Sequence, residues 1–429
     1  MSGERREPAI ALALGSSPWE SEFVAALVAK FSGSTIRRCV DVVDLAACID
    51  STRPDLVVVD DRFPRLDVST VSRISQTQSV LVGICVDKEG AARLKNLGIH
   101  EVIPVDTGGI VEAAAAIGQL RPASAALAGD TAPSTTGRDS SRFSGSHNPS
   151  RTGRVTVVWG PPGGVGRTHI AVGVAQLLAE AGRSVLLADA DSTCAGIGPA
   201  FCLTHEGSGM IAAAHHADRG TLDPAVLARL ARAITDKLRV LTGLPHIRRR
   251  AELRAAPMSR LWSVATQLTD DVIVDIGGCL DDGSLALDGD VGDFGITAGG
   301  NSAAVTALAV ADDVIAVCSC EPASVARMIS HVGAISSLAP AAQLHIVVNR
   351  VRSPVVGSNA AQAELVEFIR SQTGTANVHV VVEDRAGTDA AVAAGLTLFE
   401  ASPKSPAISG LAYVASALAA GRVPVAASA

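Results

Sequence analysis

The sequence predicts an α/β protein built from two doubly wound parallel-sheet domains. Short runs rich in Val, Ile and Leu alternate with alanine-rich segments of helical spacing along most of the chain. Such continuous apolar runs are typical of strands that a parallel sheet buries on both faces. The 429 residues exceed the length of one ordinary domain, and a polar stretch at residues 122–153 divides them. One sheet is therefore expected on each side of this stretch.

Residues 1–121 are expected to form the first domain. Strand-like and helical runs alternate there, which predicts a parallel sheet covered on both faces. The first residues are interpreted as a tail before the first strand rather than a signal peptide, because their apolar part is short. The expected strands are Ala9–Leu14, Thr35–Val40, Leu56–Asp60, Ser79–Val86 and Glu101–Pro104. The expected helices are Ser21–Phe31, Asp44–Ser51, Lys88–Leu97 and Gly109–Gly118.

The stretch PDLVVVDDRFPRLD (Pro54–Asp67) resembles the phosphorylation site of a response-regulator receiver domain. Asp60 ends the third strand as a phospho-accepting aspartate does, and Pro64 follows it. However, Gly15 and Ser16 stand where receivers carry the acidic pair that binds Mg²⁺, and no lysine follows the fifth strand. Phosphoryl transfer would lack electrostatic support without these groups. The resemblance implies a degenerate receiver, used for docking or dimerisation, with Asp60 as a vestigial phosphoacceptor.

Residues 122–153 are expected to form a flexible linker. Ser, Thr, Gly, Pro and Ala dominate this stretch, and few of its side chains could join a core. Such a composition favours a flexible chain over an ordered loop of this length. The second domain is accordingly expected to span residues 154–422. Its expected strands are Val155–Trp159, Ser184–Ala188, Leu238–Leu241, Val272–Asp275, Val314–Cys318, His345–Asn349 and Val378–Val382.

The stretch GPPGGVGRTHIA (Gly160–Ala171) is a candidate phosphate-binding loop. A strand-like run precedes it and a helical segment follows, which is the context that such a loop needs. Glycines let the backbone fold around an anion, and the N–H groups of the loop and of the helix start can then face phosphates. Thr168 is placed where a hydroxyl would bind Mg²⁺, and Arg167 replaces the usual lysine. A glycine-rich turn without a ligand is the alternative.

Polar residues follow three further strands of the second domain. Asp189 and Asp191 occur in LLADAD, and Asp275 ends the apolar run DDVIVDIGG. Asn349 in VVNRVR offers an amide that can both donate to and accept from a purine edge. Each of these residues could instead cap a helix or a strand end. Their order behind the glycine loop favours a nucleotide site, because ligands bind at the carboxyl ends of parallel strands.

The pattern GGVGRT…VLLADAD…VIVDIGG…ADD…VVNRV resembles the MinD/ParA family of deviant P-loop ATPases. A degenerate receiver ahead of such a domain resembles the CpaE/TadZ type, which acts in septum-site or pilus localisation. The stretch Val381–Pro406 is similar to the C-terminal part of the family, where a loop completes the base pocket. The resemblance implies ATP and Mg²⁺ as cofactors and a homodimer that forms on ATP binding.

The resemblance also implies roles for the matching residues. The residues that would wrap the phosphates are Gly163, Gly164, Val165, Gly166, Arg167 and Thr168. Mg²⁺ would be held by Thr168, Asp189 and Asp275, with Asp275 in the Walker B role. Asp191 would orient the attacking water, and Arg167 is the second catalytic candidate. Asn349 and Arg350 would contact adenine.

The loop departs from the family pattern at two basic positions. Pro162 stands where the signature lysine would reach the partner's nucleotide, and Arg167 stands at the ordinary P-loop lysine. Arginine keeps the charge but presents a planar fork instead of a compact ammonium. A missing cation weakens the stabilisation of phosphoryl transfer. The sequence therefore predicts nucleotide binding with weak or slow hydrolysis, and leaves enzymatic activity open.

Charge and composition limit the partners. The net charge of −7 disfavours nucleic acid as the main partner, although the cluster His246–Arg250 keeps it possible. The C-terminal stretch Gly410–Ala429 has one charged residue, so no direct membrane insertion is expected. The eight cysteines form no CxxC pair and fit a reduced, cytoplasmic compartment.

Three functions are compatible with these features. The favoured hypothesis is a nucleotide-dependent localisation factor for pilus or secretion machinery or for a septum site. It would be recruited to a pole, a septum or a membrane by a protein partner of that machine. The first alternative is a ParA-type ATPase that partitions chromosomes or cargo. The second is a nucleotide-free scaffold, because Pro161 and Pro162 remove two N–H donors from the loop.

Overall fold

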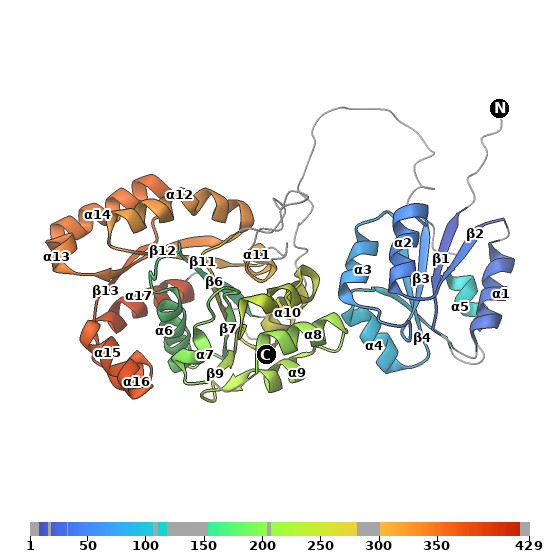
Figure 1. Cartoon of the computed structure of the whole chain (residues 1–429), viewed down its shortest axis with the longest axis horizontal. Helices are drawn as coiled ribbons and strands as arrows, with labels where there is room; N and C mark the ends of the chain where they lie inside the picture. Colours follow the sequence, from blue (N-terminus) through green and yellow to red (C-terminus); the bar gives the residue numbers. More distant parts are fainter. Residues whose placement is uncertain are drawn as a thin grey trace, which may run out of the picture. The chain divides into compact units, whose positions relative to one another are not determined.

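The computed structural model describes residues 8–15, 19–31, 33–105, 110–117, 153–203, 207–280 and 301–420 (Figure 1). These residues form two compact units, and each unit is built around its own sheet. The α/β class with two doubly wound sheets is therefore confirmed. The expected linker lies outside the described residues except for Gly153, as do the residues after Ala420.

The first unit contains a five-stranded parallel sheet in the order β2-β1-β3-β4-β5. This is the flavodoxin-like order of doubly wound folds. Every strand lies where the sequence predicts it, to within one residue at either end. The strands are β1 (Ala9–Ala13), β2 (Thr35–Cys39), β3 (Leu56–Asp60), β4 (Val80–Cys85) and β5 (Glu101–Pro104). The helices are α1 (Glu20–Lys30), α2 (Val42–Thr52), α3 (Val68–Ser75), α4 (Lys88–Asn96) and α5 (Ile110–Ile117).

Helix α3 is absent from the predicted elements. Its buried residues are Val68, Val71 and Ile74, which repeat every three positions and form one apolar stripe. Asp67 caps the helix, because its carboxylate accepts from the Thr70 N–H at 2.7 Å. The V-x-x-V-x-x-I spacing after an aspartate is the signal that could have predicted this helix.

The second unit contains an eight-stranded sheet in the order β13-β12-β11-β6-β10-β7-β9-β8. All neighbouring strands pair in parallel except β8, a two-residue antiparallel edge that the sequence did not predict. The seven predicted strands are all present. Their bounds are β6 (Arg154–Trp159), β7 (Val185–Ala190), β8 (Arg232–Ala233), β9 (Leu238–Leu241), β10 (Asp271–Ile276), β11 (Asp313–Ser319), β12 (Gln343–Val351) and β13 (Val378–Val382).

In this part of the chain most described helices lie between successive strands, and three follow the last strand, β13. The helices are α6 (Arg167–Glu180), α7 (Ile197–Ala200), α8 (Gly209–Asp218), α9 (Pro224–Leu230), α10 (Ala255–Leu268), α11 (Ser302–Ala309), α12 (Pro322–Leu338), α13 (Ser353–Val356), α14 (Asn359–Thr373), α15 (Arg385–Ala394), α16 (Leu398–Ala401) and α17 (Pro406–Ala420). The basic cluster His246–Arg250 lies in a largely exposed 3-10 turn, as expected of a solvated loop. No described helix has the length and apolar character needed to span a bilayer.

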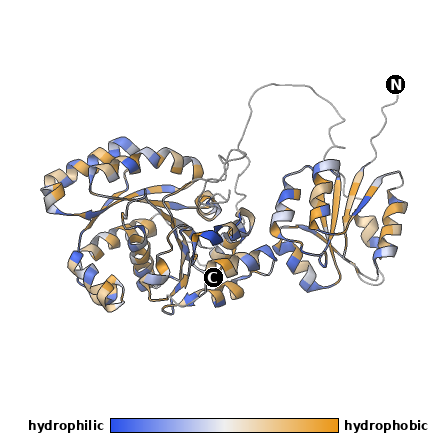
Figure 2. Ribbon diagram, in the orientation of Figure 1, coloured by the Kyte–Doolittle hydropathy of each residue, from blue (hydrophilic) through white to orange (hydrophobic). Residues whose placement is uncertain are grey.

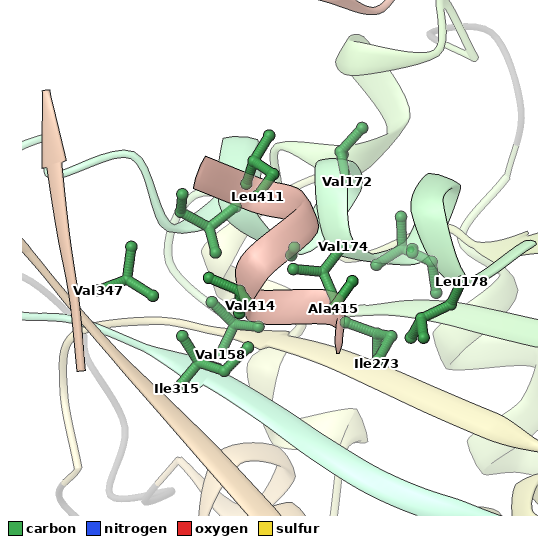
Figure 3. Close-up of a cluster of buried hydrophobic side chains, with 14 of the residues drawn as sticks. Val158, Val172, Val174, Leu178, Ile273, Ile315, Val347, Leu411, Val414 and Ala415 are labelled. Atoms are coloured by element: carbon green, nitrogen blue, oxygen red, sulfur yellow. The ribbon is translucent and has the colours of Figure 1, made fainter. Parts of the chain in front are cut away.

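Helices α6 and α17 pack against one face of the second sheet (Figure 3). Val174 and Leu178 of α6 share a buried aliphatic cluster with Leu411 and Val414 of α17. Gly173 lets the two helices approach, because a Cβ there would lie 2.7 Å from Leu411 Cδ1. Apolar residues gather on the strands and on the sheet-facing sides of helices (Figure 2). This packing fixes α6, and with it the loop that precedes α6.

Candidate functional site

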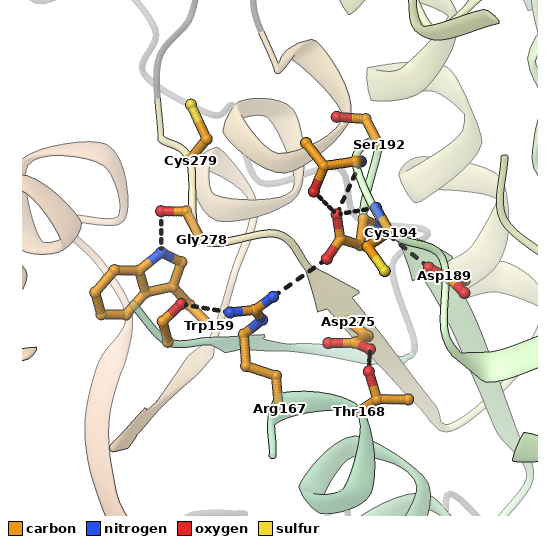
Figure 4. A network of polar contacts seen from close by, with 12 residues as sticks. Trp159, Arg167, Thr168, Asp189, Ser192, Cys194, Asp275, Gly278 and Cys279 are labelled. Carbon is orange, nitrogen blue, oxygen red and sulfur yellow. Dashed lines mark hydrogen bonds and ion pairs between the residues drawn. The ribbon is translucent and has the colours of Figure 1, made fainter. Parts of the chain in front are cut away.

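The sheet order brings three of the predicted motifs together. Strands β6, β10 and β7 are neighbours, and Asp275 of β10 pairs in register with Asp189 of β7. The glycine loop leaves the carboxyl end of β6 and enters α6. The loop, the two downstream aspartate motifs and the start of α6 therefore meet at one edge of the sheet (Figure 4). This edge is where ligands bind in doubly wound folds.

The backbone of the loop requires its glycines. Gly163, Gly164 and Gly166 have φ values of 123°, 68° and 95°, which L side chains rarely adopt. A Cβ at Gly166 would also overlap Asn349 Nδ2. Within the described part of the chain, the N–H groups of Gly163 and Gly166 have no hydrogen-bond acceptor. The loop thus presents free amide donors, as a phosphate-binding loop must.

Thr168 and Asp275 form the centre of the site. The Thr168 hydroxyl donates to Asp275 Oδ2 at 2.6 Å. Asp275 is buried, and its Oδ1 has no hydrogen-bond partner among the described residues. Burial raises the pKa of Asp275 to about 7, although the Thr168 hydrogen bond and the charge of Arg167 oppose this shift. A buried, unpaired carboxylate oxygen beside a hydroxyl fits a hydrated Mg²⁺ ion, which prefers oxygen ligands and keeps several waters.

The protein side chains alone do not form a closed metal cage. In the described ranges, no group of three or more His, Cys, Asp or Glu side chains is arranged to hold a metal ion. Such incomplete sites are normal for Mg²⁺ bound with a nucleotide, because phosphates and water supply the remaining ligands. The donors that the chain offers are the Thr168 hydroxyl and the Asp275 carboxylate.

Arg167 is held between the loop and the second aspartate motif. Its Nη1 donates to the carbonyl oxygens of Gly160 at 3.0 Å and Pro161 at 3.2 Å. Its Nη2 donates to Asp191 Oδ2 at 3.3 Å, which forms an ion pair. The planar fork reaches acceptors in different directions at once, which an ammonium on a flexible stem does not reproduce. Arg167 therefore braces the loop as well as placing a positive charge beside it.

Asp191 is engaged on both carboxylate oxygens. Oδ1 accepts from the Thr193 N–H at 2.9 Å, the Cys194 N–H at 3.0 Å and the Thr193 hydroxyl at 2.5 Å, while Oδ2 pairs with Arg167. Burial acts to raise the pKa of Asp191, but these hydrogen bonds and Arg167 outweigh it and hold the pKa below its usual value. Gly277 permits this packing, since a Cβ there would lie 2.7 Å from Asp191 Oδ1.

Asp189 lies inside β7 rather than just past a strand, because β7 continues to Ala190. Its Oδ2 accepts from the Ile197 N–H at 2.9 Å, and its Oδ1 accepts from the Asp191 N–H at 3.3 Å. Burial and the nearby Asp275 raise the pKa of Asp189 to about 8. These two hydrogen bonds order the turn after β7. The Thr168 hydroxyl donates to Asp275 and not to Asp189.

Asn349 and Arg350 lie on the other side of the loop, within β12. Asn349 Nδ2 donates to the Val165 carbonyl at 2.9 Å, and Asn349 Oδ1 accepts from the Arg350 N–H at 2.9 Å. Arg350 has φ 55°, and the pairing of β12 with β13 shifts register around it. Such irregularities re-aim side chains next to functional sites. The Asn349 amide consequently holds the loop in place.

A cavity of about 270 Å³ opens beside Asn349 and Arg350. It is lined by Gly166, His169, Asn349, Arg350, Val382, Glu383, Asp384, Arg385, Thr388, Asp389 and Ala407. Its far wall belongs to the loop after β13 and to α15, within the stretch Val381–Pro406. His169 was missed in the sequence, although it directly follows Thr168; burial and Arg350 lower its pKa.

In the first unit, Asp60 is fully buried at the end of β3. Its carboxylate accepts from the backbone N–H groups of Gly15 at 3.2 Å and Arg62 at 3.1 Å. A Cβ at Gly15 would lie 2.9 Å from the Arg62 carbonyl oxygen, so the backbone closes tightly over this carboxylate. Burial, followed by a hydrogen bond with Asp60, raises the pKa of Asp61 to about 6. Ser16 and residues 106–109, which directly follow β5 and Val105, lie outside the described ranges.

The sequence model of the CobQ/CobB/MinD/ParA nucleotide binding domain matches residues 156–397. The chain belongs to this family. The match begins in β6 and ends after α15, so it includes the loop, both aspartate motifs and all of the cavity lining except Ala407. The MinD/ParA superfamily implied by the sequence motifs is therefore confirmed, and the family is one of nucleotide-binding proteins. No curated protein matches the chain in sequence.

Solved structures of ParA and MinD ATPases resemble part of this chain. A ParA family ATPase from Chlorobium tepidum TLS is 17% identical with a TM-score of 0.50, covering 62% of this chain and 99% of that chain. The cell division ATPase MinD of Pyrococcus furiosus is 15% identical with a TM-score of 0.47, at 63% and 100% coverage. MinD of Pyrococcus horikoshii OT3, solved with Mg-ADP, is 16% identical with a TM-score of 0.48, at 63% and 99% coverage. The likeness to the Chlorobium structure supports the fold.

Proposed function

We propose that this protein binds ATP with Mg²⁺ at the glycine loop and acts as a CpaE/TadZ-like localisation factor with slow hydrolysis. The observation that carries the proposal is the buried pair of Thr168 and Asp275, with one free carboxylate oxygen, below a loop that has free amide donors. The phosphates would lie on the loop, and Mg²⁺ would be held by Thr168 and by Asp275, directly or through water. Asp189 would support this shell from its turn.

The base would enter the cavity beside the loop. Arg350 and His169 line that cavity, and Asn349 contributes its amide while holding the Val165 carbonyl. The cavity is continuous with the loop through Gly166, which lines it. A purine there would keep its phosphates within reach of the start of α6, where the helix dipole favours anions.

Slow hydrolysis is supported by how Arg167 and Asp191 are used. Arg167 donates hydrogen bonds to the carbonyls of Gly160 and Pro161 and to the carboxylate of Asp191. Asp191, the group expected to orient the attacking water, already accepts from Arg167, Thr193 and Cys194. Because an ionised carboxylate has about four acceptor sites, these contacts leave Asp191 little capacity to accept from a water molecule. Pro162 provides no cation for a partner's nucleotide.

The first unit would supply the docking function. Its strand order and the position of Asp60 support a receiver-like domain, while the buried, backbone-bonded Asp60 supports the loss of phosphorylation. ATP binding would drive homodimerisation of the second unit. A protein partner of a pilus, secretion or septal machine would then recruit the dimer from the cytoplasm.

We expect saturating Mg²⁺·ATP to stabilise the protein, because a ligand specific for the folded state adds about 2.7 kcal/mol at a concentration 100 times its Kd. Arg167→Ala should weaken ATP binding about 10-fold or more, because it removes a positive charge, two hydrogen bonds to the loop and the ion pair with Asp191. Calorimetric titration would measure both affinities.

Turnover of the wild type should be on the order of 10⁻³ s⁻¹ or slower, as in NTPases without a catalytic arginine.

Arg370→Ala is the matched control, since Arg370 is an exposed arginine on α14 paired with Glu367 at 3.7 Å. It should bind ATP like the wild type. A wild-type protein whose melting temperature and titration heat do not respond to Mg²⁺·ATP would overturn the proposal and leave the nucleotide-free scaffold.

A further inference from the structure

Arg327 lies beside the tip of the glycine loop although it belongs to α12. Its Nη1 donates to the Pro162 carbonyl at 3.1 Å, and its Nε donates to the Ala323 carbonyl one turn earlier at 3.2 Å. A Cβ built on Gly163 would lie 3.4 Å from the same Nη1. The guanidinium therefore sits at the loop position where the sequence has proline instead of a lysine.

Helix α12 is held in this position from two directions. The Ser319 N–H at the end of β11 donates to Ser324 Oγ in the first turn of α12 at 3.0 Å. One turn after Arg327, the His331 ring contacts the buried Trp159 ring at 5.6 Å. Trp159 is the last residue of β6, directly before the loop. Contacts with the ends of β11 and β6 thus fix the position of α12, and with it the position of Arg327 beside the loop.

Arg327 also has a donor to spare. Its Nη2 has no acceptor among the described residues, and neither has the adjacent Gly163 N–H. Arg167, the other guanidinium at the loop, is committed to Asp191 and to two carbonyls. A charged donor and a backbone donor that converge on one residue form a site for a phosphate group.

We propose that Arg327 contacts the terminal phosphate of bound ATP and so allows the protein to distinguish ATP from ADP. The helix would supply, within the same chain, the positive charge that the loop lacks at Pro162. ADP has no phosphate at this point, so it gains nothing from the guanidinium. A switch between two states needs such a difference in affinity. This inference rests on the nucleotide binding proposed above.

The test compares the affinities of ATP and ADP, each with Mg²⁺, for the wild type and for Arg327→Ala. Charge-assisted hydrogen bonds contribute about 1.5–3 kcal/mol, so the ATP affinity should fall about 10- to 100-fold. The ADP affinity should change less than about 2-fold. Arg327→Lys should recover part of the ATP preference because it restores the charge. Arg370→Ala on the neighbouring helix α14 should leave both affinities unchanged.

The outcomes separate this inference from the proposed function. An equal loss for ATP and ADP in Arg327→Ala would show that Arg327 only supports the loop, and would overturn the inference. Unchanged ATP affinity in that variant would overturn it too, while the proposed function would stand. A wild type that binds neither nucleotide would overturn both. The exposed position of Arg327 should leave the melting temperature of the apo variant near that of the wild type.

Discussion

Asp275→Asn is expected to stabilise the nucleotide-free protein at pH 8 and to abolish most of its affinity for Mg²⁺·ATP. Folding buries Asp275 and raises its pKa from 3.8 to about 7. A raised carboxyl pKa contributes stability below about pH 4, and this contribution is lost as the pH rises to 7. The neutral amide avoids that loss, so the free energy of unfolding should increase by about 2–4 kcal/mol at pH 8. The Mg²⁺·ATP affinity should fall about 100-fold, because a metal-binding carboxylate is gone.

Denaturant unfolding between pH 4 and 8 and calorimetric titration would measure the two effects. The slope of stability against pH should decrease in Asp275→Asn but persist in part, because the pKa of Asp189 is also raised. Asp236→Asn, at an exposed position, serves as the control and should alter neither quantity. If Asp275→Asn lost stability at pH 8 while it kept its affinity, the metal role of Asp275 would be wrong.

Trp159→Ala is expected to lower the free energy of unfolding by about 3–5 kcal/mol, the usual cost of removing a buried tryptophan. Trp159 is fully buried, its indole N–H donates to the Gly278 carbonyl at 3.3 Å, and its ring contacts His331. Gly278 packs against Pro162, since a Cβ there would lie 2.8 Å from Pro162 Cδ. ATP affinity should therefore fall together with stability. Unfolding curves and titration of the folded variant would measure this.

Two variants test the reason for this effect. Trp159→Phe keeps most of the apolar volume but loses the N–H donor. The lost hydrogen bond should lower the free energy of unfolding by about 1 kcal/mol, in addition to a smaller packing loss. Trp262→Ala removes an equally buried tryptophan whose indole bonds to Thr306 at 3.1 Å, away from the loop. It should lose similar stability and keep its ATP affinity. An equal loss of affinity in Trp262→Ala would contradict a specific role of Trp159.

Much of the fold could be predicted because its signals are local. The run Leu56–Asp60 has the predicted bounds, since a strand that is buried along its whole length needs a nearly continuous apolar run. Helix α3 was missed because its apolar stripe extends over only eight residues. The edge strand β8 was missed because two residues are too few to show a strand pattern. Asp189 was placed beyond its strand for a related reason: a carboxylate inside a buried strand contradicts the apolar pattern.

The sequence predicted which residues lie at the candidate site better than it predicted which of them bond to one another. Thr168 and Asp275, which the sequence predicts as metal ligands, are joined by a hydrogen bond. Asn349 was predicted to contact adenine, and in the structure its amide donates to the Val165 carbonyl. Arg327 and His169 were not identified, because neither lies in a motif that marks it.

By itself the sequence determined that two parallel sheets form and that a glycine loop, two aspartate motifs and an asparagine lie at or near the carboxyl ends of four parallel strands. These features depend on neighbouring residues, and a parallel sheet gathers its strand ends at one edge whatever the order. Only the tertiary structure decided which groups meet there. Arg327 reaches the Pro162 carbonyl across 165 residues, and Asn349 reaches the Val165 carbonyl across 184. Such pairings depend on the order of the strands and on the packing of α12, which no local pattern records.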